Sequence, residues 1–120
     1  KKVIRIAIDA KNQVTLDGKV VTMKELLQRV TQFIQTNGKG HLIQLQSDRD
    51  ASYDTYLHVQ NQLVAAYNTL RNQQAFNLFG KEFELCSHEQ QKQITDEIPM
   101  RISEVYNVTT ADKTDKGGPK

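Results

Sequence analysis

Hydrophobic and polar residues alternate along the start of the chain. Within residues 3–8 the isoleucines occupy every second position, so they share one face of a strand while Arg5 lies on the other. A turn at residues 9–12 and a second short strand at 13–16 predict an antiparallel hairpin. The Asp-Gly pair at 17–18 predicts another tight turn, because glycine tolerates the positive φ that such turns require.

A capping box predicts where the first helix begins. The Thr22 hydroxyl is placed to accept a hydrogen bond from the helix backbone, while the Glu25 side chain reaches back to the cap. The apolar residues that follow keep to one helical face: Leu26, Leu27, Val30, Phe33 and Ile34. Residues 37–40 (NGKG) predict the helix end, since glycine is preferred just past a helix.

A third strand and a long helix follow. Residues 41–46 (HLIQLQ) alternate again and predict a strand with one buried face. From Tyr53 to about Phe79 neither proline nor glycine interrupts the chain. Apolar residues there recur at steps of three and four, which predicts a helix that lays one stripe on the sheet: Tyr56, Val59, Leu63, Ala66 and Leu70.

The junction between this strand and helix is rich in turn and cap residues. Asp48 and Asp50 favour a turn, because their carboxylates can accept hydrogen bonds from nearby backbone N–H groups. Ser52 is the predicted N-cap of the long helix. Asp54 then lies in the first turn, where a negative charge suits the helix dipole.

The last part of the chain predicts a short helix and a final strand. Ser87 and Gln90 form a second capping box, and Pro99 is expected to end the helix. The final strand is predicted over these residues: Met100, Arg101, Ile102, Ser103, Glu104, Val105 and Tyr106. Residues 107–120 show no apolar periodicity and predict a disordered tail.

Together these elements predict an α+β fold. The order is strand, strand, helix, strand, helix, short helix, strand, which favours a two-layer sandwich with a small mixed sheet and its helices on one face. We expect one domain over residues 1–106, followed by the tail.

Composition narrows the class of protein. The net charge of the 120 residues is only +2, with 16 basic and 14 acidic side chains interleaved, so no nucleic-acid surface is indicated. No apolar run approaches the roughly 20 residues that cross a bilayer. The chain starts without methionine and runs directly into a strand, so we expect a fragment from which an upstream membrane segment has been removed. Cys86 is the only cysteine, which excludes an intrachain disulfide.

The residue types that carry chemistry do not converge on a site. Asp48, Asp50 and Ser52 imitate the first ligands of a calcium loop, but the required glycine would fall at Tyr53 and the required glutamate at Val59. A turn followed by a helix cap explains the same acids better than a metal or sugar-nucleotide site does. We therefore expect no bound metal at this junction.

The remaining candidates also favour a protein that is not an enzyme. The three histidines fall in separate predicted elements, and neither a phosphate-binding glycine loop nor the flanking signature of a catalytic cysteine occurs. We expect no cofactor and no catalytic residue.

Two stretches resemble a known family. SDRDASYDTYLHVQNQL, with Asp48, Ser52 and Tyr53 at its turn and helix start, resembles the periplasmic domains of the ExbD/TolR biopolymer-transport proteins. VIRIAIDAKNQVTLDGKVVTMKEL is similar to the first hairpin and capped helix of that family. The resemblance covers residues 3–70 and 101–105. Residues 73–99 are absent from the common short members and are expected to be an insertion.

The resemblance implies a subunit of a proton-driven motor in the inner membrane, with this domain in the periplasm. Its partners would be an ExbB/TolQ-like channel subunit, a TonB-like protein that opens outer-membrane transporters, and a second copy in a weak homodimer. A TolR-like protein would instead bind peptidoglycan. The resemblance also implies an N-terminal membrane helix, which is not among these residues. We expect the domain to contact the membrane only through that helix.

Alternatives remain open at this point. The chain could be a stand-alone α+β adaptor domain, since a common topology does not fix a function. A remoter alternative is a small enzyme whose site lies in residues 76–99. In the motor interpretation, the predicted strand at 100–106 is a candidate sheet edge for dimer or partner contacts, because edge strands expose unpaired backbone groups.

Overall fold

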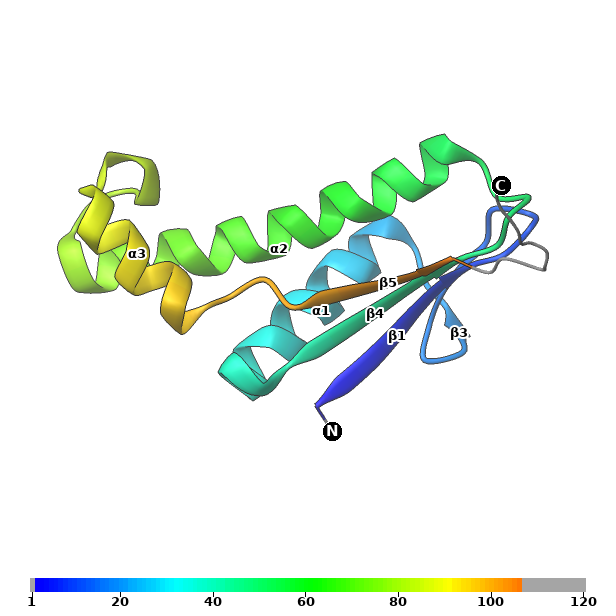
Figure 1. Ribbon diagram of the computed structural model, residues 1–120, viewed down its shortest axis with the longest axis horizontal. Helices are drawn as coiled ribbons and strands as arrows, with labels where there is room; N and C mark the ends of the chain where they lie inside the picture. The colour runs from blue at the N-terminus through cyan, green and yellow to red at the C-terminus, as the bar shows by residue number, and fades with distance from the viewer. Residues whose placement is uncertain (1, 107–120) are drawn as a thin grey trace, which may run out of the picture.

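The computed structural model describes residues 2–106, so the predicted tail at 107–120 lies outside the described residues (Figure 1). The elements follow in chain order: β1 (Val3–Ile8), β2 (Val14–Leu16), β3 (Lys19–Val20), α1 (Met23–Asn37), η1 (Gly38–Gly40), β4 (Leu42–Ser47), α2 (Tyr53–Phe79), η2 (Phe83–Leu85), α3 (His88–Glu97) and β5 (Ile102–Tyr106).

The strands form one mixed sheet in the order β3-β2-β1-β4-β5. β2 runs antiparallel to both β1 and β3, whereas β4 runs parallel to both β1 and β5. α1 and α2 lie on the same face of the sheet and contact each other (Figure 1). The predicted two-layer α+β sandwich is therefore confirmed.

Alternation in the strands fixes which face is buried. The three isoleucines of β1 are buried and Arg5 is exposed, as the sequence pattern predicted. In β4, Ile43 and Leu45 are almost fully buried. These side chains meet one stripe of each helix: Leu26, Val30 and Ile34 of α1, and Val59, Leu63, Ala66, Tyr67 and Leu70 of α2. Burial of this apolar surface is the main force that holds the two layers together.

The prediction of four strands was wrong by one. β3 has only two residues, too few for any alternation to show in the sequence. It forms because Asp17 and Gly18 both have positive φ, 50° and 86°, which is the geometry of a tight type I′ hairpin turn. This turn brings Val20 opposite Thr15 of β2.

Several predicted strand limits also need correction: β2 starts at Val14 and not at residue 13, and β4 ends at Ser47 and not at residue 46. β4 starts at Leu42, because the His41 N–H still closes the η1 turn on the Gly38 carbonyl. β5 starts at Ile102, so Met100 and Arg101 are not strand residues. The N–H of Arg101 donates to the Tyr67 hydroxyl of α2, so only the carbonyl of this residue takes part in the ladder with β4.

The end of α2, η2 and α3 form a second, smaller cluster, here named the C-terminal lobe (residues 75–98). It lies beyond the end of the sheet (Figure 1). Ala75, Cys86 and Ile94 are its buried residues, and three further apolar residues pack on them: Phe79, Phe83 and Ile98. The lobe therefore has a core of its own, with Ile98 as the residue shared with the main core.

Candidate functional site

Within residues 2–106, the sheet edge at β5 has no further strand paired to it and is the longer of the two edges of the sheet. β3, at the opposite edge, has two residues, whereas β5 has five. The Ile43 N–H donates to the Arg101 carbonyl, and Ile43 is registered with Ile102. In a parallel ladder with this register, the N–H and C=O groups of Ile102 and Glu104 point away from β4. β5 therefore presents backbone donors and acceptors to a further strand.

Two side chains of β5 attach the strand to the helical layer. Ile102 packs against the main core, and the Glu104 carboxylate is turned onto α2. There it accepts hydrogen bonds from the Tyr56 hydroxyl and, at 3.0 Å, from Gln60 Nε2. Ser103 and Val105 are exposed on the face that carries no helix. No proline or lysine within Ile102–Tyr106 blocks pairing, although such residues commonly protect natural edges.

The strand-to-helix junction is built as a turn followed by a cap. Asp48 Oδ1 accepts the Asp50 N–H at 2.9 Å. Ser52 Oγ accepts the Thr55 N–H at 3.1 Å and is the N-cap of α2. The Ser52 N–H in turn donates to Asn12 Oδ1 at 2.6 Å, which ties the start of α2 to the first hairpin. These contacts give the junction a structural role that needs no ligand.

Replacing Ser52 by alanine is expected to lower the free energy of unfolding by about 1 kcal/mol, because the Thr55 N–H then loses its acceptor at the helix start. Urea melts followed by circular dichroism measure the change. Ser52→Asp is the matched control, since aspartate also caps and should melt close to wild type. Equal melts for all three proteins would show that the side chain at 52 contributes nothing as a cap.

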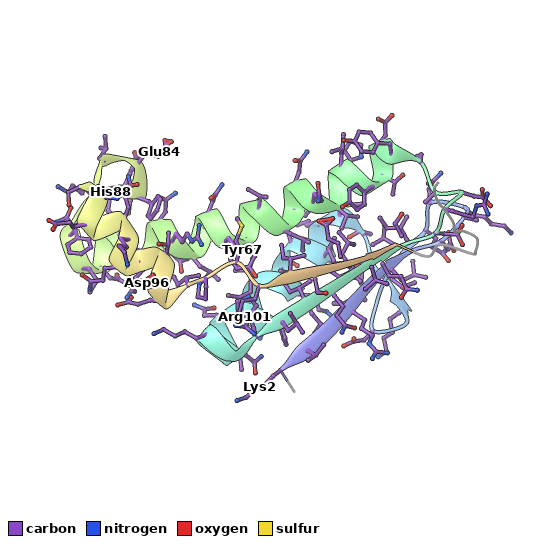
Figure 2. All side chains as sticks on the ribbon, in the orientation of Figure 1. Lys2, Tyr67, Glu84, His88, Asp96 and Arg101 are labelled. Atoms are coloured by element: carbon purple, nitrogen blue, oxygen red, sulfur yellow. The ribbon has the colours of Figure 1, made fainter. Side chains whose placement is uncertain are left out.

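A buried polar network next to the start of β5 was not foreseen from the sequence. His41 is fully buried, and its Nε2 is hydrogen-bonded to the Tyr67 hydroxyl, which is itself fully buried. The same hydroxyl accepts the Arg101 N–H at 3.1 Å, and Arg101 Nε donates to the His41 carbonyl at 3.0 Å. Figure 2 places Tyr67 on α2 beside Arg101, where the helix passes over the start of the strand. The network thus joins the residue that leads into β4, helix α2 and the connection to β5.

Burial dominates the electrostatics of this network. It lowers the pKa of the His41 imidazole, an effect that nearby Arg101 strengthens and the hydrogen bond to Gly38 opposes. It raises the pKa of the Tyr67 phenol and lowers the pKa of the Arg71 guanidinium, which lies 5.9 Å above the Tyr67 ring. At neutral pH the imidazole is therefore uncharged and the phenol keeps its proton.

The other residues that the sequence offered as candidates for metal binding or catalysis do not lie together. His58 and His88 are exposed on α2 and α3, while Cys86 is buried in the C-terminal lobe. Within residues 2–106 no three His, Cys, Asp or Glu side chains gather closely enough to hold a metal ion. A pocket of about 280 Å³ opens between α1, α2 and α3, and its lining combines amide side chains, Glu97 and three apolar residues, which are Ile34, Leu70 and Ile98.

No helix in the described part of the chain combines the length and apolar character that crossing a membrane requires.

Comparison with known proteins gives the family. The sequence profile described as biopolymer transport protein ExbD/TolR matches residues 1–74, which is more than half of the 120. No protein with a curated description matches the chain. The match takes in β1 to β4 and most of α2, including Asp48, Ser52 and Tyr53, and ends before the C-terminal lobe. The chain belongs to the ExbD/TolR family of biopolymer transport proteins.

Proposed function

We propose that these residues form the periplasmic domain of an ExbD-like subunit in the inner membrane, which passes energy from the proton-motive force to TonB-dependent transport at the outer membrane. The family membership supports energy transduction for biopolymer transport. The α+β domain supplies a binding surface, and its action is binding and conformational change, with no covalent chemistry. An ExbB/TolQ-like channel subunit is the partner at the membrane.

The observation that carries the proposal is the free edge of β5. Main-chain groups of an edge strand give affinity for an extended segment of a partner, and the side-chain positions beside it give selectivity. Here the donors of Ile102 and Glu104 face outward, while α2 holds the Glu104 carboxylate away from the ladder. A TonB-like segment or the β5 strand of a second copy is the occupant we propose.

The domain division is part of the proposal. Residues 1–106 act as one domain, and the C-terminal lobe is an elaboration inserted between α2 and β5, close to the predicted limits of 73–99. The family match ends at residue 74, and the lobe has a core cluster of its own. Both observations support this division.

Replacing Ile102 by proline is expected to abolish weak self-association of the domain. Proline removes the outward N–H while leaving the donors at Ser103 and Val105, which face β4, in place. Sedimentation over a wide concentration range measures the effect. Ile102→Ala is the matched control, because it loses a similar part of the side chain but keeps the N–H, and it should still associate.

Two outcomes would contradict edge pairing. If both variants associate as the wild type does, with matching circular dichroism, the β5 edge is not the contact. If the alanine variant also becomes monomeric, loss of packing at Ile102 explains the result and the backbone donor does not matter.

The full-length protein separates the two branches of the family. A deletion strain complemented with the wild-type gene, Ile102→Pro or Ile102→Ala is scored for uptake of iron chelates and for resistance to detergent. We expect the proline variant alone to lose chelate uptake. A loss of detergent resistance with normal uptake would assign the chain to the TolR-like branch, which tethers to the cell wall. If the wild type and both variants give normal uptake and normal resistance, the adaptor alternative is favoured.

A further inference from the structure

The hydrogen bonds around His41 fix the position of each proton. Its Nδ1 lies 2.6 Å from the Gly38 carbonyl, which can only accept, so Nδ1 carries the ring proton. Nε2 of the neutral ring is then an acceptor, and the Tyr67 hydroxyl must donate to it. The Tyr67 oxygen accepts in turn from the Arg101 N–H. The chain of donors thus runs in one direction, from Arg101 through Tyr67 to His41 and Gly38.

A second proton on His41 breaks this order. Nε2–H would face the Tyr67 O–H, so two donors would oppose each other in a fully buried site. To accept from Nε2–H, the phenol would have to turn its own hydrogen away from its present acceptor. An unsatisfied buried donor is costly, so the protonated ring and the present position of Tyr67 are not compatible.

The charges around the ring do not offset a positive imidazolium. The α2 face contributes Tyr67 and the Arg71 guanidinium, and the connection to β5 contributes Arg101, whose Nε donates to the His41 carbonyl. Phe33 of α1 meets the ring edge-on and carries no charge. On the neighbouring elements, Lys39 lies in η1, the Lys2 side chain lies beside Gly40, and Glu97 of α3 accepts a hydrogen bond from Gln74 Nε2 at 2.8 Å.

The same network holds the connection that leads into β5. Arg71 donates from Nε and Nη2 to the Ile98 carbonyl at 3.0 and 2.8 Å, and Tyr67 holds the Arg101 N–H. Residues 98–101 are therefore fastened to α2 through two side chains, one of which bonds directly to His41. If Tyr67 turns away, one of these two attachments is lost and the start of β5 is loosened.

We propose that His41 is a pH-sensitive latch: while neutral it locks Tyr67 onto residues 98–101, and on protonation it releases this segment and with it the β5 strand. The device goes beyond the proposed function, because it concerns an opening within this chain and requires no partner. Acidification would then release β5 and make this edge strand more mobile.

The direction with pH follows from linkage. The folded protein lowers the pKa of His41 from its ordinary value of about 6.5, so the opened segment binds a proton more readily than the closed one. The latch is fully closed above about pH 6.5 and weakens as the pH falls below that value. Between the ordinary and the lowered pKa, the equilibrium constant for opening rises up to about tenfold per pH unit.

Amide hydrogen exchange read by NMR, at about pH 7.5 and about pH 5.5 and corrected for the intrinsic rates, tests the proposal. The amides of Arg101, Ser103 and Val105 should open more readily at the lower pH, by up to about tenfold, while those of β1 should not. His41→Gln keeps a polar side chain that is neutral at both pH values and should remove the difference. His58→Gln, which removes an exposed histidine of α2, should keep it.

Each other outcome overturns the latch. If the β5 amides are equally protected from exchange at both pH values, protonation does not release the strand. If the amides of β1 lose protection together with those of β5, acid unfolds the whole domain. If His41→Gln does not fold, the imidazole titration of the wild type decides. We expect the His41 ring to titrate below the ordinary imidazole value of about 6.5, in step with the opening of β5, and titration at or above that value would refute the proposal.

Discussion

Replacing Leu63 by alanine is expected to lower the free energy of unfolding by about 2–5 kcal/mol, the usual cost of emptying a leucine site in a core. Leu63 is fully buried in the middle of the α2 stripe that meets the sheet and α1. Domains of this size are stable by only about 5–15 kcal/mol, so this one change removes a large fraction of the total.

Val64 supplies the matched control on the same helix. It is 42% exposed, so Val64→Ala should shift stability by less than about 0.5 kcal/mol. Urea unfolding at equilibrium measures both variants, and the midpoint should move for Leu63→Ala without a change in slope. Similar midpoints for the two variants would mean that the α2 stripe does not carry the core as the burial pattern indicates.

Most of the fold could be predicted because its signals are local. Thr22 with Glu25 and Ser87 with Gln90 form both halves of their capping boxes, and Ser52 caps α2. These motifs work through backbone groups within three residues, so the sequence alone contains the whole interaction. The long helix was predicted from Tyr53 to about Phe79, and it ends at Phe79 because Gly80 takes the left-handed conformation that stops it.

The buried network could not be predicted as a unit, although each part left a signal. His41 continues the alternation of Ile43 and Leu45 to the residue just before β4, which places its side chain on the same buried side. Tyr67 lies four residues after Leu63 on the buried stripe of α2. What the sequence lacks is the crossing of helix and strand that brings these two polar groups, 26 positions apart, into contact.

The C-terminal lobe was foreseen only in outline. The sequence showed a short capped helix and a proline after it, but nothing told whether that helix joins the main core. The structure answers with two clusters that share Ile98. Besides the continuous helix α2, they are linked by hydrogen bonds from Arg71 to the Ile98 carbonyl, from Gln74 to Glu97 and from the Phe83 N–H to Asn72. So narrow a connection predicts that the lobe can open without the sheet, since stability is distributed in local cooperative units.

Replacing Ile94 by alanine is therefore expected to destabilise the lobe alone. Ile94 is fully buried in the second cluster, and its truncation should cost about 2–5 kcal/mol, toward the lower end because so small a cluster can collapse around the gap. Amide exchange should speed up in α3 and at the end of α2, while the amides of β1 and β4 keep their protection. Gln93→Ala, an exposed neighbour on α3, is the control and should leave every element unchanged.

The pattern of exchange decides how the lobe serves the domain. If only the lobe opens, the part of the chain that matches the family stays folded and the lobe is a separable addition. Unfolding of the lobe would then lengthen the unstructured connection between α2 and β5. A uniform loss of protection across β1, β4 and α3 would instead make the lobe part of one cooperative unit. In that case the β5 edge depends on α3 for its position, and partner binding should fall with Ile94→Ala as it does with Ile102→Pro.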